Sequence, residues 1–153
     1  MKKLFWSLLV VTFISCSKDA VDSASTISNQ PLTGIVEGKA FTVNGGQAFF
    51  RSSSSAEEIT IYLTNDDFGC ETSIFDYNLI ISATVPNMVG VYTDINIVTQ
   101  DGNNTPFNSL GETVEITAVS ATEISGKMKL TKESSAISAA SIFEGSFTVP
   151  ICE

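Results

Sequence analysis

The sequence contains no histidine, and this absence removes several common kinds of catalytic and metal site. Histidine is the usual general base near neutral pH, a frequent zinc ligand and a member of Ser-His-Asp and Cys-His arrangements. The serines of residues 51–58 therefore have no base to activate them. Adjacent Glu57 and Glu58 would point to opposite faces of a strand, so they do not form the facing pair that glycoside hydrolysis needs. We expect a protein that is not an enzyme and that uses no cofactor.

Long apolar runs are also missing, except at the N-terminus, where Lys2 and Lys3 precede the mostly apolar residues 4–14. This run is too short to cross a bilayer as a helix, which takes about twenty apolar residues. A basic start, a short apolar centre and a small residue before Cys16 are typical of a secretory signal peptide. A buried strand or core helix is the alternative, but it leaves the paired lysines unexplained. We predict that residues 1–15 are removed on export.

The stretch "FISC", residues 13–16, resembles the lipobox of bacterial lipoproteins, in which apolar and small residues precede a cysteine. In that family the cysteine is acylated and becomes the first residue of the mature chain. The resemblance implies that Cys16 carries lipid chains and tethers the protein to a membrane. The residues after it, "SKDA", and later phrases such as "GKAFTVNGG" and "GSFTVPIC" resemble small all-β outer-membrane lipoproteins of Bacteroidota-type bacteria. This resemblance implies an outer-membrane location, on the periplasmic face or the cell surface, and transfers no functional residue.

Basic side chains are scarce, and the predicted export makes them scarcer. The whole chain has 8 Lys and Arg against 17 Asp and Glu, and removal of Lys2 and Lys3 would change the net charge from −9 to about −11. Such a surface repels nucleic-acid phosphates and anionic lipid headgroups. Lys127, Lys129 and Lys132 form a strip that suits the solvent face of one strand. We therefore expect no nucleic-acid partner.

Taking 15 residues from the 153 leaves 138, which is enough for one domain with a hydrophobic core. Residues 16–34 follow the predicted cleavage site, are polar and contain Pro31 and Gly34, so we predict that they form a flexible tether starting at the lipidated cysteine. The remaining residues, 35–153, are predicted to form the folded domain.

Beyond Cys16 the chain has only two cysteines, Cys70 and Cys152. In an oxidising compartment such a pair is most simply a disulfide. The alternative, a pair of redox-active thiols, lacks a Cys-x-x-Cys motif. We predict a Cys70–Cys152 bridge that holds the C-terminus against an earlier loop.

From residue 35 onward apolar and polar residues alternate with a period of two, and no window shows a convincing amphipathic helix. Asn44 and Gly45 suggest a hairpin turn within residues 41–50. Further strands are predicted at 59–64, 77–85, 94–99, 113–120, 123–131 and 142–151. About eight strands joined by short turns predict a single all-β antiparallel domain, either a β-sandwich or an up-and-down, lipocalin-like barrel.

Two glycines in the last predicted strands, Gly126 and Gly145, fall on the inward-facing phase. A missing side chain there indicates a bend in the strand or a position covered by a neighbouring ring, which Phe143 or Phe147 is placed to supply. The alternative is a ligand that approaches the glycines.

Residues 101–112 form a first candidate calcium loop, because Asp101, Asn103 and Glu112 fall at ligand positions of a calcium-loop count. Pro106 occupies the position that requires glycine, which excludes an EF-hand. A calcium site of less regular geometry remains one alternative, and a simple turn between two strands is the other.

Asp66, Asp67 and Glu71 form a second acidic loop whose carboxylates are able to surround a hard cation. Three carboxylates in a turn are more often solvated. We therefore predict no metal site and keep both loops as weak calcium candidates.

The sequence as a whole predicts a lipid-anchored envelope protein of non-catalytic function. It would bind an envelope protein or a small ligand through its loops or the mouth of a barrel. The alternative is a structural or accessory subunit of an outer-membrane complex, and a carboxylate-based hydrolase is less favoured.

Overall fold

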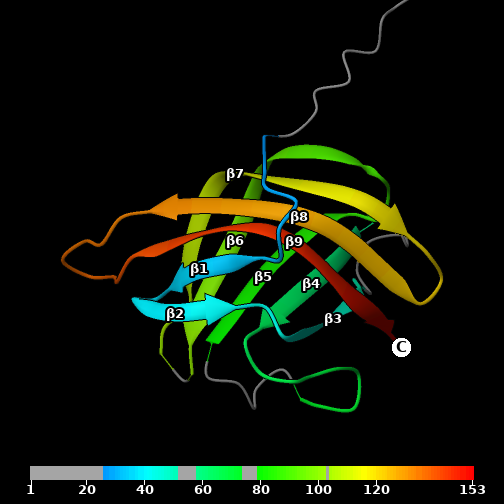
Figure 1. The fold of residues 1–153 in the computed structure, drawn as a ribbon, viewed down its shortest axis with the longest axis horizontal. Coiled ribbons are helices and arrows are strands. Elements are labelled where there is room, and N and C mark those ends of the chain that lie inside the picture. Colours follow the sequence, from blue (N-terminus) through cyan, green and yellow to red (C-terminus); the bar gives the residue numbers. More distant parts are fainter. Residues whose placement is uncertain (1–25, 52–57, 74–78, 103) are drawn as a thin grey trace, which may run out of the picture.

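The computed structural model describes residues 26–51, 58–73, 79–102 and 104–153, and all regular secondary structure in them is β (Figure 1). The prediction of an all-β domain is confirmed. The described residues form nine strands, one more than the approximate prediction: β1 (Thr33–Val36), β2 (Lys39–Thr42), β3 (Gly45–Phe50), β4 (Glu58–Thr64), β5 (Leu79–Pro86), β6 (Gly90–Asp101), β7 (Phe107–Val119), β8 (Glu123–Lys132) and β9 (Ser141–Cys152). The predicted signal peptide, residues 1–15, and the predicted lipidation site Cys16 lie outside the described residues.

Strands β3 to β9 form a closed barrel. Each strand is antiparallel to the next one along the chain, and β9 returns to β3, where Ala48 pairs with Ile151 and Phe49 with Cys152. This closing pair is parallel because an up-and-down chain of seven strands leaves the first and the last pointing the same way. Of the two architectures left open by the sequence, the β3–β9 pairing selects the barrel.

The interior of the barrel is filled by apolar side chains, most of them aliphatic. In β4, Ile59, Ile61 and Leu63 are fully buried, whereas Thr60 and Tyr62 lie on the outer face, as the alternation predicted. The other strands add side chains to the same core, namely Ala48, Leu79, Ile81, Ala83, Val85, Ile97, Val114, Ile116, Ile124, Met128, Leu130, Phe143, Phe147 and Val149. Burial of this apolar surface is the main source of stability for the fold.

The β1–β2 hairpin covers one end of the barrel. β1 pairs with β9, and the side chains of Val36 and Phe41 are buried in the barrel core. The hairpin turns at Glu37 and Gly38, whose φ angles of 46° and 78° are both positive, as a two-residue type I′ turn requires.

The predicted hairpin at Asn44-Gly45 is wrong. β2 pairs with β1, while β3 pairs along its whole length with β4 and at its end with β9. Asn44 and Gly45 do not have the positive φ angles of a primed turn, because the two flanking segments pair with other strands of the sheet.

The ordered domain begins earlier than residue 35. Ile27 is buried, Leu32 is fully buried, and both the carbonyl of Gln30 and the N–H of Leu32 hydrogen bond to the backbone of Ser146 in β9. The predicted tether is therefore wrong for residues 26–34, while residues 16–25 lie outside the described residues. Backbone docking explains the error: Gly145 leaves room for this segment, since a Cβ there would lie 2.5 Å from the Cα of Leu32.

Strands β6 and β7 are longer than predicted, and β7 includes residues 107–112, which were predicted to be a loop. The pairing of β6 with β7 contains register shifts, and Asp94 and Gly111 have φ angles of 60° and 81°. Such bulges interrupt the alternation of inward and outward residues. A strict period of two therefore misses the ends of both strands.

The predicted covering of a glycine by a ring is confirmed at Gly126. Phe147 lies opposite this residue in β9, and a Cβ at position 126 would come within 2.7 Å of its ring. Gly145 is covered by the chain at Gln30 and Leu32 instead of by a ring.

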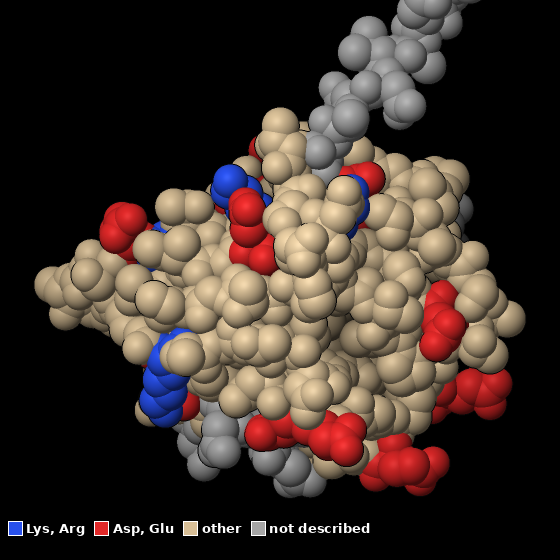
Figure 2. Space-filling model, in the orientation of Figure 1, with Lys and Arg blue, Asp and Glu red and all other residues tan. Residues whose placement is uncertain are grey.

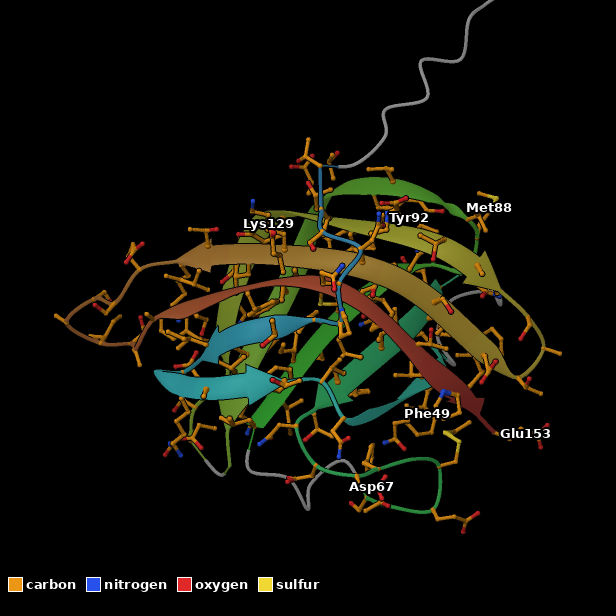
Figure 3. All side chains as sticks on the ribbon, viewed as in Figure 1. Phe49, Asp67, Met88, Tyr92, Lys129 and Glu153 are labelled. Atoms are coloured by element: carbon orange, nitrogen blue, oxygen red, sulfur yellow. A yellow bond between two sulfur atoms is a disulfide. The ribbon has the colours of Figure 1, made fainter. Side chains whose placement is uncertain are left out.

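The predicted disulfide between Cys70 and Cys152 is present, with the two Cα atoms 5.4 Å apart. It joins the connection between β4 and β5 to the last residue of β9 (Figure 3). Gln47 of β3, which is only 1% exposed, lies against Cys152. The bridge therefore secures the strand that closes the barrel.

Candidate ligand groove at one end of the barrel

Three connections meet at the end of the barrel that the β1–β2 hairpin covers: the β1–β2 turn, the β6–β7 connection and the β8–β9 connection (Figure 1). A groove of about 630 Å³ lies between them. Its lining is contributed by Glu37, Asp101, Asn104, Thr105, Pro106, Phe107, Ile137, Ser138 and Ala139.

One lining residue, Glu37, belongs to a hydrogen-bonded group that we call the Glu37 cluster: Glu37, Thr99, Lys132 and Ser141. Oε1 of Glu37 accepts hydrogen bonds from Thr99 Oγ1 at 2.5 Å, Ser141 Oγ at 3.1 Å and Lys132 Nζ at 3.4 Å. The side chains of Thr99 and Ser141 are fully buried, and those of Glu37 and Lys132 are each 15% exposed. A carboxylate in such a position is stable only when donors surround it, and this cluster supplies them from three strands.

The same cluster holds the backbone of the β1–β2 turn. The N–H of Glu37 donates to Ser141 Oγ at 3.0 Å, and the N–H of Gly38 donates to the carbonyl of Ala140 at 2.8 Å. Glu37 has the positive φ that side chains other than glycine adopt only at a cost. These contacts compensate that cost and fix the position of the turn.

Each of the two carboxylates that line the groove forms an ion pair with a lysine. Lys132 pairs with Glu37 and also lies 3.5 Å from the centroid of the Phe107 ring, a cation–π arrangement that fixes this wall. Lys39 contacts both oxygens of Asp101 at 2.8 Å. The groove is thus preformed, and its charges are largely balanced within the protein.

The remaining lining combines hydrogen-bonding and apolar groups. Asn104, Thr105 and Ser138 offer an amide and two hydroxyls, while Pro106 and Ile137 offer apolar contact. Ile137 is 86% exposed, so a ligand in the groove would remove a large apolar side chain from water. A concave surface with a few placed polar groups and apolar walls is typical of binding sites.

No family model, curated protein or solved structure matches the chain.

The first calcium candidate is not brought into a metal-binding arrangement. Asp101 ends β6 and is paired with Lys39, residues 107–112 form part of β7, and Asn103 lies outside the described residues. A strand cannot wrap around a cation as a calcium loop does, so the predicted loop is wrong for residues 107–112.

The second calcium candidate, Asp66, Asp67 and Glu71, lies on the connection between β4 and β5 (Figure 3). Within the described part of the chain, no three Asp, Glu, His or Cys side chains lie close enough to hold a metal ion. On the face shown in Figure 2, acidic side chains are spread along the lower and right edges of the molecule. Asp66, Asp67 and Glu71 are exposed, so they contribute to the negative surface charge.

The carboxyl group of Glu112 is the one group in the described residues with a clearly shifted pKa. It occupies the inward-facing phase of β7, two residues before buried Val114, and pairs with Ile95. Burial raises the pKa of Glu112 above its ordinary value because the apolar surroundings disfavour the charged form.

Glu37, Thr99 and Ser141 have no sequence signal of a site, and Lys132 was predicted only to belong to a surface strip. The four members of the Glu37 cluster belong to the β1–β2 turn, β6, β8 and β9. Nothing in their local sequence indicates that they meet. The Glu37-Gly38 pair is a plausible turn signal, but it does not identify the groups around it.

No helix in the described part of the chain is long and apolar enough to cross a membrane.

Proposed function

We propose that the protein is a lipid-anchored, non-catalytic binding domain of the cell envelope, and that the groove beside Glu37 receives its ligand. The observation that carries the proposal is the groove itself, about 630 Å³ in volume, with preformed polar groups and apolar walls. Sites for small molecules and peptide side chains commonly have volumes of about 300 to 1,000 Å³. The N-terminal stretch ending at Cys16 supports the anchor.

The groove is a better binding site than the barrel interior. The interior is occupied by the aliphatic side chains of the core, among them fully buried Ile81, Ile97 and Met128. A lipocalin-like ligand in the lumen would have to displace them, and close-packed cores resist such changes. The ligand is therefore placed at the outer end of the barrel, between the β6–β7 and β8–β9 connections.

Binding is favoured over hydrolysis by the state of the two groove carboxylates. Glu37 is engaged by Lys132, Thr99 and Ser141, and Asp101 is engaged by Lys39. Glycoside hydrolysis needs one carboxyl group that holds a proton and a second that is free to act as base or nucleophile. The lysine partners instead suit these carboxylates to a fixed, hydrogen-bonding role.

The anchor is tested with Cys16→Ser, expressed from the full-length gene. The unsubstituted protein should sediment with the envelope fraction and incorporate a labelled fatty acid, whereas Cys16→Ser should do neither. Cys70→Ser is the matched control, because it removes a different cysteine and should leave the lipid label in place. Sedimentation and labelling of Cys16→Ser equal to those of the unsubstituted protein would defeat the anchor.

The groove is tested on the mature chain carrying Cys16→Ser, which is soluble under this proposal. Two-dimensional amide NMR spectra are recorded while a library of small amphiphilic compounds is added. Compounds that bind should shift the amide signals of Asn104, Thr105 and Ser138. Ala139→Trp, which fills the groove from an exposed lining position, should abolish these shifts. Shifts that persist in Ala139→Trp, or that fall only on other surfaces, would show that the groove is not the binding site.

A further inference from the structure

The turn between β5 and β6 exposes an unusual amount of apolar surface. Met88, Val89 and Val91 are 64%, 59% and 41% exposed, and they fall within four consecutive positions. The turn is held in one shape, because the hydroxyl of Tyr92 donates to the carbonyl of Met88 at 2.8 Å and the N–H of Met88 donates to the carbonyl of Pro86 at 2.8 Å. The apolar side chains are thus displayed by a fixed backbone at one edge of the molecule (Figure 3).

The pairing of the strands relates this turn to the entry of the chain into the fold, which lies three strands away around the seven-stranded barrel. Val91 of β6 pairs with Glu115 of β7, which pairs with Lys127 of β8, which pairs with Ser146 of β9. Ser146 in turn bridges to Pro31, at the start of the fold. Neighbouring strands are about 4.8 Å apart, so these four steps place Val91 about 20 Å from Pro31 along the barrel wall.

The length of chain before the fold keeps the barrel within reach of the membrane, because it exceeds the distance from Pro31 to the turn. This step rests on the proposed lipidation of Cys16. Ten residue steps separate Cys16 from Thr26, the first described residue, and they span at most about 36 Å when fully extended. Because residues 27–34 already belong to the fold, the barrel is held closer to the lipid than a tether up to residue 34 would hold it.

The β5–β6 turn and the ligand groove lie at opposite ends of β6. This strand contains 12 residues and runs from Gly90, beside the turn, to Asp101, in the groove. At a rise of about 3.3 Å per residue the two ends are at most about 36 Å apart. Contact of the β5–β6 turn with a membrane surface would therefore leave the groove exposed to solvent.

We propose that Met88, Val89 and Val91 enter the interfacial region of the bilayer, so that the anchored barrel stands with its ligand groove facing away from the membrane. The turn sequence from Pro86 to Gly90 contains no Lys or Arg, so its attraction to lipid is apolar and not electrostatic. The acidic domain is repelled by anionic headgroups. A zwitterionic phospholipid surface is therefore the occupant that this turn fits.

The test uses tryptophan fluorescence, because Trp6 in the predicted signal peptide is the only tryptophan of the sequence. The full-length gene with Trp6→Phe and Val89→Trp is expressed, so that any uncleaved precursor carries no second tryptophan. The lipidated mature protein that begins at Cys16 is purified from membranes and reconstituted into phosphatidylcholine vesicles with or without brominated acyl chains. The fluorescence of the tryptophan reporter introduced by Val89→Trp should be quenched by the brominated lipid at least about twofold more than that of a tryptophan in water. Ile137→Trp, in the groove at the other end, is the matched control and should not be quenched.

Failure of the orientation is distinguishable from failure of the anchor. If both reporter variants float with the vesicles but Val89→Trp is not quenched, or if Ile137→Trp is quenched equally, the orientation is overturned while the anchor stands. If neither variant floats, the anchor fails and the orientation with it. If the emission of Val89→Trp shifts to the blue with protein concentration in the absence of vesicles, a second copy covers the turn and the lipid contact is overturned. Met88→Trp provides a second reporter should Val89→Trp not fold.

Discussion

The carboxylate of Glu37 accepts a hydrogen bond from Ser141 Oγ at 3.1 Å, although 104 residues separate the two in the sequence. In the opposite direction, the backbone N–H of Glu37 donates to the same hydroxyl. This reciprocal contact fastens the β1–β2 hairpin to the start of β9. It holds the hairpin over the end of the barrel and fixes the position of Glu37, which lines the groove.

The first prediction concerns this contact. Glu37→Gln keeps the size of the side chain but leaves Lys132 without its charged partner in a site where each is only 15% exposed. The free energy of unfolding should fall by about 1 to 3 kcal/mol, because partly buried charges lose more than surface charges when a partner is removed. Urea denaturation at neutral pH with the disulfide intact measures the change.

Glu144→Gln is the matched control for Glu37→Gln. Glu144 pairs with Lys129 at 3.1 Å, but the two side chains are 42% and 49% exposed. Its loss should change stability by about 0.5 kcal/mol or less, because exposed ion pairs are screened by water. Equal effects of the two substitutions would contradict the role of the Glu37 cluster in holding the hairpin.

The second prediction concerns the packing of Phe147 against Gly126. Gly126→Ala would place a Cβ 2.5 Å from the carbonyl oxygen of Glu115 and 2.7 Å from the Phe147 ring, so it should destabilise by about 1 to 3 kcal/mol. Gly69→Ala is the control, because a Cβ there meets nothing within 4 Å. Thermal unfolding compares them, and a neutral Gly126→Ala would refute the close packing.

The third prediction concerns the disulfide. The double variant Cys70→Ser, Cys152→Ser should lose about 3 to 5 kcal/mol, because the bridge restricts a long loop of the unfolded chain. Reductant should destabilise the unsubstituted protein by a similar amount and leave the double variant unchanged. Alkylation of both thiols in the absence of reductant, measured by intact mass, would show that the bridge does not form.

The fourth prediction concerns pH and Glu112. Because burial raises the pKa of Glu112, the folded state binds this proton more tightly than the unfolded state, and stability falls as pH rises from 4.5 to the raised value. Glu112→Gln removes this loss. The variant should therefore gain melting temperature relative to the unsubstituted protein between pH 4 and pH 7.

The control for Glu112→Gln is Glu133→Gln, at an exposed position just after β8. Its melting temperature should follow that of the unsubstituted protein across the same pH range. A difference between Glu112→Gln and the unsubstituted protein that does not change with pH would show that charge burial is not the cause.

Several features could be predicted from the sequence, because they depend on residues that are close in the chain or because only one pairing was possible. The alternation from Ile59 to Leu63 predicted which face of β4 is buried, since successive side chains of a strand point to opposite faces. The Cys70–Cys152 bridge could be predicted because only one pair was left beyond Cys16. The covering of Gly126 followed from the inward phase of two adjacent strands.

The tertiary structure decided what depends on segments that are distant in the sequence. Barrel closure rests on Ala48 meeting Ile151, docking of the first ordered residues rests on Gln30 meeting Ser146, and the site rests on Glu37 reaching Ser141. The physical reason is that alternation and turn residues act locally. Strand pairing instead depends on which distant segment removes the apolar side chains of a strand from water. The burial of a polar group depends on which distant residues satisfy its hydrogen bonds.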